Sequence, residues 1–216
     1  MQKLGTILSS HRVYFFGYAL SLILFLLPQL SYNQKELFLL INEYNSPSLD
    51  FKFYWLTHVG DGLAFTLLIV VLLFFSYSKA LIGLITFLST SLLAQIIKRG
   101  LFSDAIRPFG ELSTSYNLHV PDGVTTITFY SFPSGHTVTA FAIATFVILS
   151  FPNKKTSLLV LLIAWLVGYS RIYLTHHYPI DVWVGSIIGT LGALLIYWLF
   201  ATKFDNKLGN RSVLNR

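Results

Sequence analysis

Two short groups of polar residues carry side chains that could bind and cleave a phosphate ester. The first is the run Pro133-Ser134-Gly135-His136, and the second comprises Ser170-Arg171, His177 and Asp181. Each group lies beside the start or the end of a long apolar run. Imidazoles and carboxylates perform acid–base and nucleophilic chemistry, and a guanidinium matches the oxygens of phosphate. These residues indicate a membrane enzyme that acts on a phosphorylated substrate.

The first group opens an apolar run, so Ser134 is a candidate N-cap of a helix. The amides of Gly135 and His136 would then point outward from the positive end of the helix dipole, as in an anion-binding site. Glycine allows close approach of the backbone, and His136 could protonate a leaving group. A capped helix start with an interfacial histidine is the purely structural alternative.

In the second group His177 and Asp181 are four residues apart, which places them on one face of a helix entering the last apolar run. A carboxylate so placed fixes the tautomer of the imidazole and makes its other nitrogen a better nucleophile or base. Pro179 suits the first turn of that helix. The structural alternative is an ion pair between Arg171 and Asp181 beside a solvated His177.

His176 is not separated from His177 by chemistry alone, although the spacing to Asp181 favours His177. A metal site built from His136, His176, His177 and Asp181 is disfavoured, because adjacent histidines are poor partners for one ion and the carboxylates usual in two-metal phosphatases are missing. The chain has no cysteine, which excludes thiolate chemistry and Cys-based zinc sites. We therefore expect no metal and no cofactor.

The composition is that of an integral membrane protein. Of 216 residues, 54% are hydrophobic and 11% are charged, with a mean hydropathy of +0.65, and these values lie outside the range of ordinary soluble domains. No Ser/Gly/Pro-rich linker, low-complexity tract or tandem repeat divides the chain. We expect one membrane-embedded domain covering residues 1–216.

The apolar runs predict an all-α fold, a bundle of six transmembrane helices, because about 20 mostly apolar residues cross a bilayer. A shorter segment, Gln34 to Tyr44, predicts an interfacial helix, with an ordered loop as the alternative. No small-residue cleavage site follows the first run, so it is expected to remain as a helix. The six predicted spans are Val13–Leu30, Gly62–Ser78, Ala80–Ile97, His136–Phe151, Thr156–Tyr173 and Ile180–Phe200.

Charge placement predicts that both termini are cytoplasmic, since Lys and Arg accumulate on cytoplasmic loops. The Lys98–Pro108 segment and both polar groups would then face the outer side, where a lipid headgroup lies. The net charge of +6 agrees with this membrane topology, and no basic patch with interleaved aromatic residues suggests nucleic acid. The cytoplasmic side would hold one acid, Asp205, and nine bases: Lys3, Arg12, Lys79, Lys154, Lys155, Lys203, Lys207, Arg211 and Arg216.

These residues resemble the motifs of the type 2 phosphatidic acid phosphatase family, membrane lipid-phosphate phosphatases related to bacterial acid phosphatases and vanadium haloperoxidases. The resemblance covers roughly residues 60 to 200. Pro133 to His136 match the second family motif, and Ser170, Arg171, His177 and Asp181 match the third. In the first motif Arg107-Pro108 matches, with Lys98 as the preceding cation and Arg99 as its alternative. Eight residues separate Lys98 from Arg107, where the family usually has six.

The resemblance implies that His177 attacks phosphorus to form a phosphohistidine, that Asp181 orients it, and that His136 protonates the leaving oxygen and then activates water. It implies that the non-bridging oxygens are held by Lys98, Arg107, Ser134, Gly135 and Arg171, and that no metal is needed.

The expected substrate is a membrane lipid phosphate or diphosphate, of the polyprenyl diphosphate, phosphatidylglycerophosphate, phosphatidate or lipid A type. The stretch from Phe109 to Tyr130 would lie over the outer mouth of the pocket and shape the choice of headgroup. No obligate protein partner is indicated. The alternative is a non-catalytic transporter or lipid-binding module that retains the phosphate pocket.

Overall fold

The computed structural model describes residues 3–208 and 211–215, so Arg216, counted above among the cytoplasmic bases, lies outside the described residues. The predicted all-α fold is confirmed over the described ranges, where every regular element is helical. The elements are α1 (Leu4–Ser10), α2 (Arg12–Ser31), α3 (Gln34–Glu43), α4 (Pro47–Leu56), η1 (Thr57–Gly60), α5 (Gly62–Leu73), α6 (Tyr77–Ile96), η2 (Ile97–Leu101), α7 (Pro108–Leu112), α8 (Gly135–Ser150), α9 (Lys154–Tyr173) and α10 (Pro179–Leu208).

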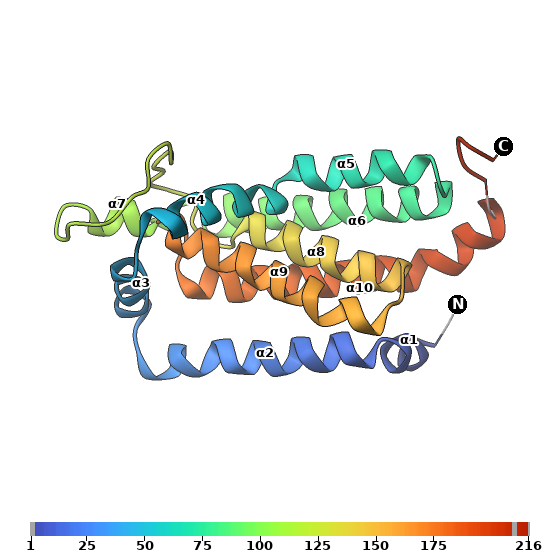
Figure 1. Ribbon diagram of the computed structural model, residues 1–216, viewed down its shortest axis with the longest axis horizontal. Coiled ribbons are helices and arrows are strands. Elements are labelled where there is room, and N and C mark those ends of the chain that lie inside the picture. Colours follow the sequence, from blue (N-terminus) through green and yellow to red (C-terminus); the bar gives the residue numbers. More distant parts are fainter. Residues whose placement is uncertain (1–2, 209–210, 216) are drawn as a thin grey trace.

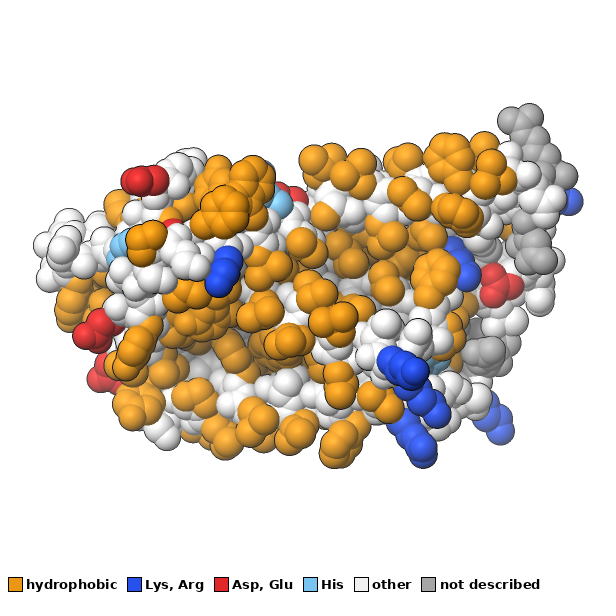
Figure 2. Space-filling view, in the orientation of Figure 1, with side chains coloured by type: hydrophobic (Ala, Val, Ile, Leu, Met, Phe, Trp, Pro, Cys, Tyr) orange, Lys and Arg blue, Asp and Glu red, His pale blue; other side chains and the backbone are white. Residues whose placement is uncertain are grey.

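The long helices run side by side along the longest axis of the molecule (Figure 1). Helix α10 packs against α8 and α6, α8 packs against α9, and α9 packs in turn against α2. The short helices α3, α4 and α7 gather at the end opposite to both termini (Figure 1). Hydrophobic side chains cover the middle of the visible face, whereas Lys and Arg side chains concentrate at the terminal end and Asp and Glu side chains at the other (Figure 2).

Four helical segments, Arg12–Ser31, Tyr77–Leu101, Lys154–Tyr173 and Pro179–Leu208, are long and apolar enough to cross a membrane. A bent pair formed by Pro47–Gly60 and Gly62–Leu73 raises the number to five if the pair is one span. Helix α8 has 16 residues, below the length of about 17 that usually spans. The predicted count of six is therefore not confirmed.

The predicted span Gly62–Ser78 is wrong at its C-terminal end. Helix α5 ends at Leu73, and the next helix begins at Tyr77 instead of Ala80. Ser76 causes this break, because its Oγ accepts a hydrogen bond from Lys79 N (3.3 Å) and caps α6. The two phenylalanines before Ser76 made the apolar run look continuous.

Helix α4 is an element that the apolar pattern did not predict, because Asp50 and Lys52 interrupt the run. Its start carries a recognisable signal, since Ser46 caps it and Pro47 occupies its first turn. The helix continues through η1 to a break at Gly60, where the axis bends by 54° into α5.

The predicted helix at Gln34 is confirmed as α3. Asn33 and Glu36 form a reciprocal capping box at its start (both bonds 2.9 Å). The Oε1 of Gln34 accepts a hydrogen bond from Ile180 N (2.8 Å), so α3 is attached to the first turn of α10.

Helices α8 and α10 meet backbone to backbone because α10 carries glycine at the contact. A Cβ added at Gly189 would lie 2.9 Å from Ala142 N and 3.0 Å from Phe141 Cβ, closer than such contacts allow. A Cβ added at Gly185 would lie 2.9 Å from Ser134 O. This close packing brings the start of α8 within hydrogen-bond distance of α10, where Ser134 N donates to Asp181 O (3.1 Å).

We predict that Gly189→Ala destabilises the bundle by about 1–3 kcal/mol, the usual cost of overpacking a closely packed core. The added methyl would meet the backbone of α8, which cannot move aside as a flexible side chain can. Thermal unfolding of the purified protein in detergent measures the effect. Gly5→Ala is the control, because nothing lies within 4 Å of a Cβ at Gly5. Equal melting temperatures for the two variants would contradict the packing described here.

Candidate active site

The structure brings the three polar segments singled out in the sequence to one end of the bundle. Arg107, from the loop before α7, lies beside His177, from the loop between α9 and α10. Ser134, at the start of α8, is hydrogen-bonded to Asp181 of α10. The contacts join residues far apart in sequence into one buried cluster.

His177 and Asp181 form the centre of the cluster, with His177 Nδ1 3.2 Å from Asp181 Oδ2. Both are almost fully buried, with exposed fractions of 2% and 3%. The predicted contact is present, but the two residues do not share a helix face as expected, because His177 precedes α10, which begins at Pro179. Asp181 lies in the first turn of the helix and reaches back to the loop.

Asp181 Oδ2 accepts two further hydrogen bonds, from Ser131 Oγ (2.5 Å) and from Tyr178 N (3.0 Å). These donors fix the carboxylate in the orientation that faces His177. Ser131 was not predicted as a site residue. Its only sequence signal is its position two residues before Pro133, and nothing in that position indicates an aspartate partner.

The second nitrogen of the His177 ring is available as an acceptor. Its Nε2 lies 3.4 Å from Nη1 of Arg107, and a guanidinium can only donate. Burial lowers the pKa of His177 well below its usual value, and the positive charges of Arg107 and Lys98 lower it further. The ring is therefore neutral at physiological pH, with its Nδ1 proton directed to Asp181.

His176 is distinguished from His177 by its partners. Its Nδ1 accepts a hydrogen bond from Arg171 Nη2, and its Nε2 donates to Thr125 O (2.9 Å). Burial and the charge of Arg171 lower the pKa of His176 to about 3. Both nitrogens of His176 are thus held by the protein in short contacts, whereas Nε2 of His177 faces only the guanidinium of Arg107, at 3.4 Å.

Arg107 is held by three backbone carbonyls as well as facing His177. Its Nε donates to Phe129 O (2.8 Å), Nη1 to His176 O (3.1 Å) and Nη2 to Tyr130 O (3.2 Å). The guanidinium is therefore rigidly placed at the end of the bundle. Burial lowers the pKa of Arg107, and the charge of Asp181 opposes this shift.

Arg171 is also buried, with an exposed fraction of 5%, and its Nη1 donates to Thr57 Oγ1 (2.6 Å). The alternative ion pair between Arg171 and Asp181 is not formed among the described residues. The Nε of Arg171 is buried and has no hydrogen-bond partner within the described chain. A buried donor of this kind is satisfied by a ligand oxygen or by water.

The side chains of Lys98 and Arg99 lie in different environments. Both lie in η2, a π-helical turn that ends the long α6 segment. Lys98 has an exposed fraction of 8% and lies close enough to His177 for its charge to act on the ring. Arg99 is exposed and donates to Gln95 Oε1 (3.1 Å). The geometry therefore places Lys98, and not Arg99, with the cluster.

At the start of α8, Ser134 occupies the N-cap position, but its side chain does not cap the helix as expected. Its hydroxyl instead accepts a hydrogen bond from Thr137 Oγ1 (2.9 Å). A Cβ added at Gly135 would meet nothing within 4 Å, so the backbone there faces open space. The first amides of the helix have no intrahelical acceptor and suit an anion.

His136 pairs with a carboxylate that the motifs did not supply. Its Nε2 lies 2.7 Å from Asp61 Oδ1, at the bend between η1 and α5. The other oxygen of Asp61 lies 2.7 Å from His58 Nδ1. In the sequence, Asp61 stands between Gly60 and Gly62 at the start of an apolar run, and nothing there indicates its partner.

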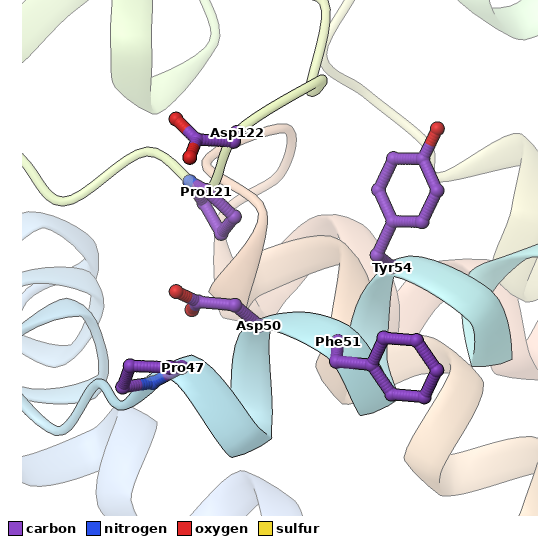
Figure 3. Close-up of a pocket in the computed structure, with 6 residues that line it drawn as sticks. All are labelled: Pro47, Asp50, Phe51, Tyr54, Pro121 and Asp122. Carbon is purple, nitrogen blue, oxygen red and sulfur yellow. The ribbon is translucent and has the colours of Figure 1, made fainter.

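The loop between α7 and α8 is anchored beside the cluster. His119 Nε2 lies 2.8 Å from Asp50 Oδ1 of α4, and Asp50 also accepts a hydrogen bond from Tyr173 of α9. A hollow lies between α4 and this loop, with the carboxylates of Asp50 and Asp122 at its rim (Figure 3). The loop reaches the cluster at Thr125, the carbonyl partner of His176.

Within the described part of the chain, no group of three or more His, Cys, Asp and Glu residues is arranged to hold a metal ion. The cluster instead combines three cations with one His–Asp pair. This donor set suits a phosphate, whose oxygens accept hydrogen bonds from cations and backbone amides.

The structure is therefore a helical bundle with apolar, span-length helices and a cluster of buried cations at one end. Residues 79–205 match the model of the PAP2 superfamily. This match covers more than half of the chain, and the chain is a member of the PAP2 superfamily.

Several solved structures and known proteins are similar to this chain. LpxE from Aquifex aeolicus is 31% identical, with a TM-score of 0.66 over 76% of this chain and 93% of that one. A PAP2-type phosphatidylglycerolphosphate phosphatase from Bacillus subtilis is 27% identical, with a TM-score of 0.56 over 87% and 96%. The undecaprenyl-diphosphatase of Sulfolobus acidocaldarius is 30% identical over 72% of both chains.

A shorter match gives higher identity. The bacitracin transport permease protein BcrC of Bacillus licheniformis is 48% identical over 68 residues, which is 32% of each chain. The chain thus matches about a third of the length of this relative.

We predict that Ser131→Ala destabilises the protein by about 1–3 kcal/mol, because it removes a hydrogen bond to the buried Asp181 carboxylate. Thermal unfolding in detergent measures the change. Ser113→Ala, at an exposed serine whose side chain forms no hydrogen bond with the described residues, should leave the melting temperature unchanged. If Ser131→Ala had the same melting temperature as Ser113→Ala, the hydrogen bond to Asp181 would contribute nothing to stability.

Proposed function

We propose that the protein is a metal-independent lipid phosphate or diphosphate phosphatase. The observation that carries the proposal is the excess of buried positive charge around His177. Lys98, Arg107 and Arg171 are buried with Asp181 as the only buried carboxylate of the described residues. An uncompensated buried charge is costly, and a phosphate bearing two negative charges would offset the excess.

In the proposed first step, Nε2 of His177 attacks phosphorus while the bond from phosphorus to the leaving oxygen breaks. His136 gives that oxygen its proton, so that the products are a phosphohistidine and a neutral alcohol or a protonated phosphate leaving group. Asp181 holds the Nδ1 proton and stabilises the positive charge that develops on His177. The lone pair on Nε2 and the burial of His177 support the assignment.

In the second step, water attacks phosphorus, the bond from nitrogen to phosphorus breaks, and His136 takes the proton from the water. The non-bridging oxygens are held throughout by Lys98, Arg107, Arg171 and the start of α8 at Ser134 and Gly135. Such preorganised donors match the charge on the equatorial oxygens during phosphoryl transfer.

Membrane location and the relatives support a lipid phosphate as the substrate. The relatives named above include an undecaprenyl-diphosphatase and a phosphatidylglycerolphosphate phosphatase. A lipid can leave its tails in the bilayer while its headgroup enters a site at the end of the bundle. Polyprenyl diphosphate, phosphatidylglycerophosphate, phosphatidate and lipid A phosphate form the panel to test.

We propose six spans, with α4, η1 and α5 acting together as one bent span and α8 as a short one. The termini lie in the cytoplasm and the site at the extracytoplasmic face of the cell membrane. Support comes from the concentration of Lys and Arg at the terminal end of the bundle (Figure 2).

The test of the nucleophile is phosphate release and phosphoenzyme formation by the wild type, His177→Ala and His176→Ala, in detergent with EDTA across the lipid panel. We expect His177→Ala to abolish both turnover and the acid-labile phosphoenzyme. His176→Ala should keep phosphoenzyme formation, because the nitrogens of His176 bind the protein itself. Activity surviving in His177→Ala would move the role to His176, and binding of lipid without turnover by folded wild type would favour a transporter or lipid-binding module.

The low pKa of His177 predicts the acid side of the pH profile. Attack requires the neutral ring, and burial keeps the ring neutral down to well below pH 6.5. Activity should therefore not fall with a midpoint near 6.5, the usual pKa of histidine, as the pH is lowered. The dependence of kcat/KM on pH, measured between about pH 4 and 8 with stability checked at each pH, tests this. An acid limb centred near 6.5 would contradict the assignment of His177 where it reflects neither the second ionisation of the substrate phosphate, with a pKa of about 6, nor protonation of the Asp181 carboxylate.

A further inference from the structure

Asp61 has an unusual role for its position in the fold. It is the N-cap residue of α5, where an aspartate normally accepts hydrogen bonds from the first amides of the helix. Its side chain makes no such bond. Its two oxygens are instead 2.7 Å from His136 Nε2 and 2.7 Å from His58 Nδ1.

The chain is shaped to hold this carboxylate against the start of α8. A Cβ added at Gly60 would lie 2.7 Å from His136 O and 2.8 Å from Val167 Cγ1, so η1 approaches α8 as closely as only glycine allows. Thr57 of the same turn binds Arg171. The bend between η1 and α5 is therefore built around the cluster, and Asp61 stands at its apex.

We propose that Asp61 is the positioning residue of His136, as Asp181 is of His177. The inference rests on the proposed function, in which His136 is the acid that protonates the leaving oxygen. Asp61 Oδ1 accepts the Nε2 proton of His136 and leaves Nδ1 as the nitrogen that serves the phosphate. His58, on the second oxygen, holds the carboxylate in this orientation.

The surroundings of His136 agree with these separate roles of its two ring nitrogens. Its Nδ1 has no hydrogen-bond partner among the described residues. A hollow of about 230 Å³ adjoins the pair and has Ser91, Gln95 and Thr139 among its lining residues. Because His136 borders this hollow, a leaving group placed there would lie within reach of its ring.

The charges near His136 explain why a protonated ring needs the carboxylate of Asp61. Burial opposes a positive charge on the ring, and the charge of Arg171 from α9 opposes it further, whereas His176 in the loop before α10 is neutral at physiological pH. Asp61 is the carboxylate that favours the imidazolium. Without Asp61, fewer molecules would carry the proton that the leaving oxygen needs.

The experiment compares the wild type with Asp61→Asn and Asp61→Ser. Both replacements are good N-cap residues, so the start of α5 is retained while the carboxylate is lost. Asp122→Asn, at an exposed aspartate of the loop between α7 and α8, is the charge-matched control. Melting in detergent confirms folding, and kcat/KM is measured against pH for an alkyl lipid phosphate and for 4-nitrophenyl phosphate, whose leaving group needs less help from a proton.

We expect the alkaline limb of the profile for the lipid phosphate to move to lower pH by about one unit or more in both variants, because His136 must be protonated and has lost its opposite charge. At pH values above the limb this corresponds to a loss of about tenfold or more. The loss with 4-nitrophenyl phosphate should be smaller. Asp122→Asn should follow the wild type.

If a folded Asp61 variant had its alkaline limb at the same pH as the wild type, the inference would be overturned. An equal loss of kcat/KM on both substrates would also overturn it. These results would leave the proposed function standing, because the wild type would still release phosphate. Absence of phosphate release from the folded wild type would instead overturn the proposed function itself.

Discussion

The burial of three positive charges at one end of the bundle is the constraint on which the rest of this structure depends. A guanidinium or ammonium group withdrawn from water must find acceptors, and for Arg107 the backbone supplies three of them. Arg107 takes the carbonyl oxygens of Phe129, Tyr130 and His176. The irregular loop before α8 follows this requirement, because its carbonyl groups point inward to the guanidinium instead of pairing in a helix.

The helices are arranged so that their ends, and not their faces, supply the site. Glycines at the contact of α8 with α10 bring the two backbones together and join Ser134 to Asp181. The π turn at the end of α6 places Lys98 inside and Arg99 outside. The π turn and the bend between η1 and α5 therefore lie next to site residues, as expected where local geometry serves function and not regular packing.

Much of this arrangement could be predicted from the sequence, and the failures have physical causes. Apolar runs predicted the helices α2, α6, α9 and α10, and fixed motif spacing predicted which polar segments to examine. Helix α4 was missed because hydropathy does not distinguish a polar-faced helix from a loop. The partners of Ser131 and Asp61 were missed because they are distant in sequence, and only the folded chain brings a lone serine to Asp181 or a lone aspartate to His136.

The two histidines differ in environment, and this difference supports their proposed roles. His177 is 2% exposed, is bonded to a buried carboxylate and faces a guanidinium, so its ring stays neutral and keeps a lone pair. The side chain of His136 is 30% exposed and is bonded to Asp61, which is 34% exposed and is shared with His58. Burial disfavours a proton on both rings, but more cations face His177 than His136, where Asp61 opposes the charge of Arg171. Where two like groups differ in this way, the one that accepts a proton more readily is the better candidate for the acid. In this chain the same pairing of histidine with aspartate is made twice, and the proposed roles follow the difference in burial: the deeper pair is the proposed nucleophile and the shallower pair the proposed acid.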